Sequence, residues 1–205
     1  MVELSWRPAI LHRVKSATSD RYVEWALELA QSAAAVCNYC DHIEHNETVD
    51  RAWVTDAGRV LRDVACSMAA HEDEDLRDLY GARLRQIERR NPLWSPDDLD
   101  GGALVEQAAT WRDLQLAQAE HDRRYHPDVA GLAKLDQLRH YALHLAKLAG
   151  AVAGVAQGHV DRADFCARRL PDLLLFGLKL ATVTGERLAD VELPAAGQPL
   201  KLVAS

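Results

Sequence analysis

The chain has 205 residues, of which 48% are hydrophobic, and this composition favours a folded protein with a sizeable core over a disordered one. Its formal net charge of −7, from 24 basic and 31 acidic side chains, argues against general nucleic-acid binding, which needs a basic face. The same charge is compatible with a small phosphorylated ligand that local Arg and Lys side chains, or a metal ion, would hold.

The sequence indicates neither a leader peptide nor a membrane span. Residues 1–13 contain no long apolar run after the first basic residue, so they do not resemble a signal peptide. The longest apolar run, residues 173–178, is far too short to cross a bilayer. Four cysteines in a chain of this length do not make a dense disulfide framework: Cys37, Cys40, Cys66 and Cys166. We therefore predict a cytoplasmic protein that does not bind membranes.

Apolar side chains recur at helical spacing in the first part of the chain and predict three helices, at about 20–45, 49–70 and 72–90. The clearest interruption follows at residues 91–102, which contain two prolines, a Gly-Gly pair and several aspartates. Because these residues interrupt helices, we expect a linker or surface loop there.

Three further helices are predicted at about 103–124, 132–157 and 161–186. Pro171 falls inside the last of them, where it either kinks the helix or starts a new one in its first turn. Residues 189–205 include two prolines and a glycine, and we expect an extended tail that packs on the body or on a partner chain.

The whole pattern predicts an all-α bundle of about six main helices, because Ala and Leu are abundant while β-branched and aromatic residues are comparatively few. The predicted organisation is an N-terminal helical half (1–90), the linker (91–102), a second helical half (103–188) and the tail (189–205). The amphipathic helices and the apolar tail also favour a homo-oligomer.

Three stretches of the second half have an order and spacing that match a known superfamily. They are WRDLQ at 111–115 with the residues that follow to 122, LHLAKLAG at 143–150, and DLLLF at 172–176 continuing to Gly185. On these stretches, residues from about 104 to 191 resemble the MazG-like nucleotide pyrophosphohydrolases, which are all-α proteins. The resemblance implies that the second half is a MazG-like helical unit.

The resemblance also implies a chemistry. Family members bind Mg²⁺ through a Glu-x-x-Glu and a Glu-x-x-Asp pair on facing helices, and they cleave nucleoside triphosphates to the monophosphate and pyrophosphate, usually as oligomers. Several carboxylates are needed because Mg²⁺ is a hard cation that prefers oxygen ligands and clamps phosphate charge. A nucleotide or related phosphorylated ligand and a divalent metal are therefore expected.

This chain departs from the family pattern at the metal site. The four acidic positions align with Leu148, Ala151, Arg169 and Asp172, so only one carboxylate is kept. We expect weak or altered pyrophosphohydrolase activity, or, as an alternative, an inactive helical scaffold that interacts with other proteins. The predicted contacts to a phosphate are basic side chains near these positions: Arg169, Lys147 and Arg168.

A second alternative is a histidine-based metalloprotein. His140 and His144 are four residues apart on one predicted helix, and together with Asp172 they could form a two-His-one-carboxylate site for a transition metal. Two histidines at this spacing are also typical of a solvated or hydrogen-bonded helix face.

Cys37 and Cys40 form a Cys-x-x-Cys pair that could contribute to a zinc site, or they could be small buried side chains of the core. A basic cluster at Arg83, Arg85 and residues 89–90 is typical of the last turns of a helix and could also bind a nucleotide phosphate.

Overall fold

The computed structural model describes residues 17–91 and 100–193, and they confirm the all-α fold class. Within these ranges the backbone forms helices and loops, and β-pairing is limited to one isolated bridge between Thr110 and Glu192. The helices are α1 (Ala17–Glu44), α2 (Ala52–Glu72), α3 (Leu76–Arg90), α4 (Gly101–Gln107), α5 (Trp111–Tyr125), α6 (Pro127–Ala130), α7 (Lys134–Ala156), α8 (Arg162–Arg168) and α9 (Leu170–Thr184).

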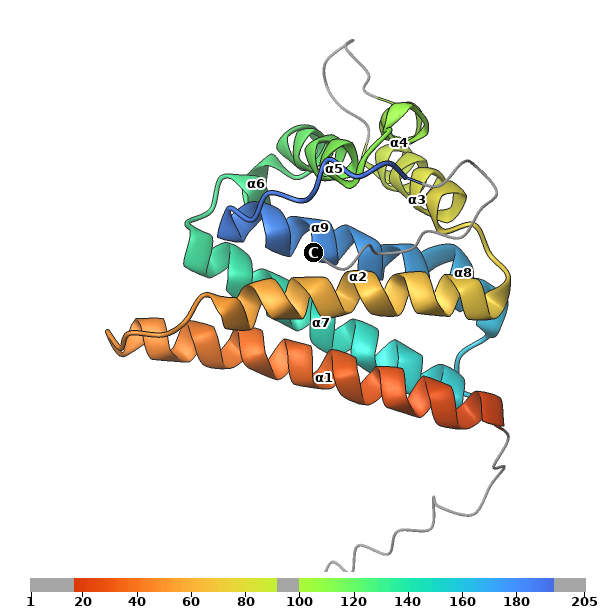
Figure 1. The fold of residues 1–205 in the computed structure, drawn as a ribbon, viewed down its shortest axis with the longest axis horizontal. Helices are drawn as coiled ribbons and strands as arrows, with labels where there is room; N and C mark the ends of the chain where they lie inside the picture. Colours follow the sequence, from red (N-terminus) through yellow and green to blue (C-terminus); the bar gives the residue numbers. More distant parts are fainter. Residues whose placement is uncertain (1–16, 92–99, 194–205) are drawn as a thin grey trace, which may run out of the picture.

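Four helices, α1, α2, α7 and α9, form a bundle in which α1 packs against α7 and α2 packs against α9 (Figure 1). Two of these helices come from each half of the chain. Their buried faces join one hydrophobic core that includes Trp25, Leu61, Leu145 and Leu174. The two predicted halves therefore share a core.

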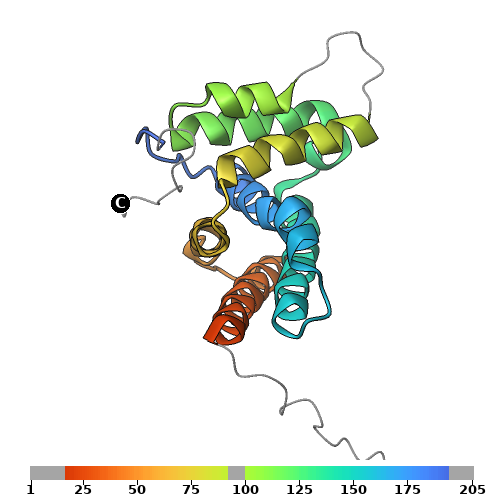
Figure 2. The same cartoon turned by 90° about the vertical axis from the view of Figure 1, so that its right-hand side faces the viewer.

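A second layer of helices covers one side of this bundle. Helices α3, α4 and α5 lie together across α9, as Figures 1 and 2 show, and the short α6 leads from α5 back to the bundle. Helix α9 consequently has neighbours on nearly every side, and all its residues except Thr182 are buried. This central position explains why its sequence is almost wholly apolar rather than amphipathic.

Several predicted boundaries differ from the observed ones. The helix predicted at 103–124 is two helices, because the Thr110 side chain accepts a hydrogen bond from the Asp113 backbone and starts α5 with a capping box. Gly101 and Gly102 begin α4 instead of ending the linker. Of the two alternatives for Pro171, the structure shows the new start, since Pro171 lies in the first turn of α9.

Other predictions concern residues outside the described ranges. These include the N-terminal residues 1–13, most of the predicted linker (92–99) and most of the predicted tail (194–205). The first part of the tail is described, and there the Leu193 backbone N–H donates to the Ala109 carbonyl across 2.8 Å. Among the described residues, none of the helices combines the length and apolarity that crossing a membrane requires.

Candidate functional site

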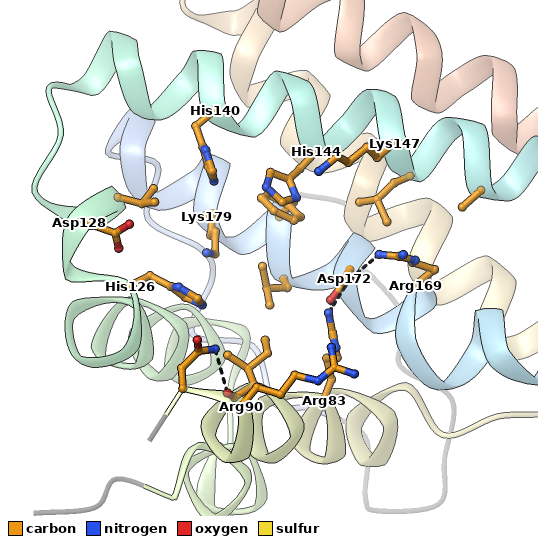
Figure 3. Close-up of a pocket in the computed structure, with 17 residues that line it drawn as sticks. Arg83, Arg90, His126, Asp128, His140, His144, Lys147, Arg169, Asp172 and Lys179 are labelled. Atoms are coloured by element: carbon orange, nitrogen blue, oxygen red, sulfur yellow. Dashed lines mark hydrogen bonds and ion pairs between the residues drawn. The ribbon is translucent and has the colours of Figure 1, made fainter. Parts of the chain in front are cut away.

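A pocket of about 750 Å³ lies where α3, α6, α7 and α9 meet (Figure 3). Ten of the 17 residues that line it carry ionisable side chains, and they come from segments far apart in the sequence. These residues are Arg83, Arg90, His126, Asp128, His140, His144, Lys147, Arg169, Asp172 and Lys179.

Helix α7 supplies one wall of this pocket. Its residues His140, His144 and Lys147 are four and three positions apart, so they lie on one face of the helix and project into the pocket (Figure 3). The other face of α7 is buried in the bundle through Leu138 and Leu145, among others. Burial of that apolar face fixes the rotation of α7 and therefore the direction of its polar side chains.

Helix α9 supplies two charges from inside the core. Asp172 and Lys179 are seven residues apart, which is about two helical turns, and both line the pocket although only 6% and 7% of each residue is exposed. The Lys179 ammonium lies 2.8 Å from an Asp122 carboxylate oxygen and 5.4 Å from the Phe176 ring centre. Asp172 lies in the first turn of α9, where the helix dipole favours a negative charge.

The Asp172 carboxylate is held by arginines. Arg83 of α3 donates from Nε to Oδ1 at 2.7 Å and from Nη2 to Oδ2 at 3.1 Å, which is the two-point geometry that strengthens an Arg–carboxylate pair. The Arg169 guanidinium lies 3.9 Å from Oδ2. Burial raises the pKa of the Asp172 carboxyl above its ordinary value, while Arg83 opposes that effect.

The histidines of the pocket are held in their neutral form. Burial lowers the pKa of His144 to about 4, and the nearby His140 and Lys147 add to this shift. Burial and the positive charge of Lys179 lower the pKa of both His126 and His140. The His144 ring stacks on Phe176 with centroids 4.7 Å apart, and its centroid is also 4.7 Å from that of His140.

The pocket has an excess of positive charge in a chain that is acidic as a whole. Five Arg and Lys side chains line it against two carboxylates, Asp128 and Asp172. Lys147, Arg169 and Arg90 are exposed, so they are accessible to a ligand from solvent. Among the described residues, neither Lys147 nor Arg90 forms an ion pair with a carboxylate, whereas Lys179 pairs with Asp122. The arrangement suits an anion.

Most of the residues that the sequence singles out meet here. Lys147, Arg169, His140, His144 and Asp172 all line the pocket. Arg168 does not, because its guanidinium pairs with Asp164 on α8. Leu148 and Ala151, which align with two of the family's acidic positions, also line the pocket.

The donors present do not fit a divalent ion. His140 and His144 are neighbours, but the third predicted ligand, Asp172, already binds Arg83 through both oxygens. In the part of the chain that the structure describes, no group of three or more His, Cys, Asp or Glu side chains is placed to hold a metal. The predicted site of His140, His144 and Asp172 is therefore not assembled, since its carboxylate is committed elsewhere.

Two side chains of the pocket make contacts that the sequence pattern does not indicate. In the sequence, Arg83 is one of a cluster of arginines. Its partner, Asp172, is 89 residues away, so the spacing of nearby residues does not indicate this pair. The sequence pattern does not assign a role to Lys179, which is the only cation inside the apolar run of α9 and lies two turns after Asp172. A charge without an apparent partner in a wholly apolar helix is a signal that could have found it.

Within the described residues, Cys37 and Cys40 do not belong to any group of three or more side chains placed to hold a metal. Cys40 is buried and Cys37 is exposed, and both belong to α1. Cys66 is also buried, and burial raises its pKa to about 12. The interpretation of Cys40 as a small hydrophobic core residue fits the structure.

No protein-family model, no curated protein and no solved structure matches this chain. The resemblance to MazG-like proteins remains a prediction, and the function is inferred from the pocket.

Proposed function

We propose that the pocket between α3, α6, α7 and α9 binds a nucleotide or a related phosphorylated small molecule, and that the chain is a MazG-like protein with weak or altered pyrophosphohydrolase activity. Two of the five cations in the pocket, Arg83 and Lys179, are paired with Asp172 and Asp122. The observation that carries the proposal is the excess of positive charge from the three exposed cations, Lys147, Arg169 and Arg90, in a chain with a net charge of −7. A phosphorylated ligand is the small-molecule class that best uses such an excess.

The shape of the pocket supports a ligand with a charged and an organic part. Lys147 on α7, Arg169 at the start of α9 and Arg90 at the end of α3 line the pocket from three helices. Apolar side chains, including Leu148, and the stacked rings of His144 and Phe176 also line it. Phosphate oxygens can meet the cations while an apolar or aromatic group packs on the rings.

The side chains available in the pocket point to a chemistry that differs from that of the MazG-like family. With Asp172 bound to Arg83, the metal-activated water of the family is not supported by these residues. A neutral imidazole such as that of His140, or the exposed Asp128 carboxylate, is available to accept a proton from water. General-base catalysis without a metal gives smaller accelerations, so slow turnover is expected.

Titration calorimetry with adenosine monophosphate, adenosine triphosphate and pyrophosphate tests the binding. Arg169→Ala should weaken binding by about tenfold or more, since a charge-assisted hydrogen bond to phosphate is lost. Arg168→Ala is a matched control, because the adjacent Arg168 pairs with Asp164 outside the pocket. No binding of any of these anions, or equal losses in the two variants, would contradict the proposal.

The alternative is a scaffold that has the fold without the chemistry. Two observations favour this alternative. Leu148 and Ala151 place apolar side chains in the pocket, and Arg83 binds the Asp172 carboxylate. A pyrophosphate-release assay with adenosine triphosphate separates the cases. Binding with slow release supports the enzyme, binding without release supports an inactive ligand-binding protein, and the absence of both supports the scaffold.

A further inference from the structure

We infer that this pocket recognises its anion without a divalent cation, because Arg83 neutralises Asp172, the carboxylate to which a metal would bind. The inference rests on the proposed function and specifies which form of the ligand the pocket accepts. It departs from what the MazG resemblance implies, since that resemblance would place a metal ion at this carboxylate.

The contacts of Asp172 leave no place for a cation. Its two oxygens accept from Nε and Nη2 of Arg83 at 2.7 and 3.1 Å, and Arg169 lies 3.9 Å from one of them. The remaining Arg83 nitrogen, Nη1, donates to Gln86 at 2.5 Å. A metal ion would have to displace a guanidinium that is itself mostly buried, leaving that charge without a partner.

The other groups around Asp172 disfavour a metal ion as well. Leu148 and Ala151 face the pocket with apolar side chains, and Lys147, Arg169 and Lys179 add positive charge. A divalent cation would be repelled by these groups and would gain few oxygen ligands. An anion, in contrast, would be attracted to the pocket. Arg83 already neutralises the Asp172 carboxylate, and the exposed cations remain available to bind the anion.

This arrangement has a consequence for the ligand class. Triphosphates bind Mg²⁺ through several phosphate oxygens, which lowers their charge and occupies the atoms that arginine and lysine would contact. A phosphate monoester binds Mg²⁺ only weakly and keeps its oxygens free. The pocket is therefore suited to a metal-free phosphate monoester, such as a nucleoside monophosphate, in preference to a Mg²⁺-bound triphosphate.

Calorimetry on the wild-type protein tests the inference with two probes, adenosine monophosphate and adenosine triphosphate, each in EDTA and in excess MgCl₂. We expect the Kd for the monophosphate to agree within about twofold between the two conditions, while Mg²⁺ weakens triphosphate binding by about fivefold or more. Binding that requires Mg²⁺, or that becomes tighter with it, overturns the inference but leaves the proposed function standing. Absence of binding in both conditions overturns the proposed function, and the inference with it.

The variant Asp172→Asn gives a second test, in which a metal site and a charge-compensated anion site predict opposite results. If Asp172 held a metal, its loss would abolish the binding that is seen in MgCl₂. If Arg83 compensates it, removal of a negative charge leaves monophosphate binding in EDTA unchanged or up to about tenfold tighter. A loss of tenfold or more in a variant that still unfolds cooperatively on heating would overturn the inference, and the wild-type comparison decides the question if the variant does not fold.

Discussion

His121 shows how a single buried side chain makes the stability of this protein depend on pH. The residue is fully buried and stacks on Tyr125 with ring centres 4.8 Å apart. Burial lowers the pKa of His121 to about 3, and the positive charge of Lys179 acts in the same direction. Glu88, whose own pKa is raised by burial, lies 3.4 Å from Nε2 of His121. The imidazole is therefore neutral in the folded protein at neutral pH.

Acidification should destabilise the protein through this histidine. The unfolded chain binds a proton on His121 near pH 6.5, whereas the folded protein does so only near pH 3. The unfolded state therefore holds more protons between these values, so the stability is complete above about pH 6.5 and falls as the pH drops towards 3. The folding equilibrium constant should change by up to about tenfold per pH unit for this group.

Urea unfolding of His121→Phe at several pH values between 7 and 4 measures this contribution. Phe keeps an aromatic ring beside Tyr125 but cannot be protonated, so the variant should lose less stability on acidification than the wild type. His45→Gln is the control, because His45 is exposed on the protein surface. If His121→Phe and the wild type lose stability at the same rate, the neutral buried histidine is not the cause.

At the scale of elements, the contact between α4 and α3 depends on a glycine. The Gly101 backbone N–H donates to Glu88 across 2.7 Å. A Cβ atom added to Gly101 would lie 2.5 Å from that same Glu88 oxygen, 2.9 Å from His121 and 3.1 Å from Leu84. The Gly-Gly pair, which the sequence pattern assigns to a linker, instead allows a helix to approach its neighbours closely.

Gly101→Ala should destabilise the protein by roughly 1–3 kcal/mol, because the new methyl group overlaps buried atoms. Gly150→Ala on α7 is the matched comparison, since a Cβ atom added to Gly150 would meet nothing within 4 Å and alanine is a better helix former. It should leave stability unchanged or raise it by up to about 1 kcal/mol. Equal effects of the two substitutions in chemical denaturation would contradict the close packing of α4.

Helix existence was predictable from the sequence, whereas helix ends and helix partners were less so. The long helices α1, α2 and α7 follow the periodic apolar residues closely, because one face of each is buried. The break before α5 depends on the capping of Thr110, which is a short-range geometric effect that apolar spacing does not report. The apolar run of α9 indicated burial but not which helices surround it.

The candidate site was predictable in part for the same reason. The spacing of His140, His144 and Lys147 places them on one helix face, so their common location follows from α7 alone. The pairing of Asp172 with Arg83 depends on how α3 crosses α9, which is a tertiary arrangement. That one contact changes the interpretation of Asp172 from a metal ligand to a compensated charge.

At the scale of the whole molecule, the interleaving of the two halves determines where the pocket forms. Helix α3 belongs to the first half, and α6, α7 and α9 belong to the second, so the pocket requires both. Arg62 of α2 connects the halves again by donating to the Gly177 carbonyl on α9 at 3.1 Å. Separate expression of residues 1–90 or 103–188 would expose the shared core.

A second surface bears on the predicted homo-oligomer. A groove of about 490 Å³ runs between α1 and α7, and its lining is mainly alanine and glycine without a charged side chain. Leu27 borders it with 60% of the residue exposed, and Leu143, one turn before Ala146 on α7, is 67% exposed. Exposed leucines beside an apolar groove are typical of an interaction surface, so we propose that the predicted homo-oligomer forms when a second copy of this chain packs against this face.

Sedimentation velocity across a range of protein concentrations tests this arrangement. Leu27→Glu should weaken self-association by about tenfold or more, because a two-fold contact buries the introduced charge twice without a partner. Leu116→Glu is the control, since Leu116 is also half-exposed but lies on α5, away from the groove. A wild-type protein that remains monomeric at the highest concentration, or equal effects of the two substitutions, would contradict an interface between copies at α1 and α7.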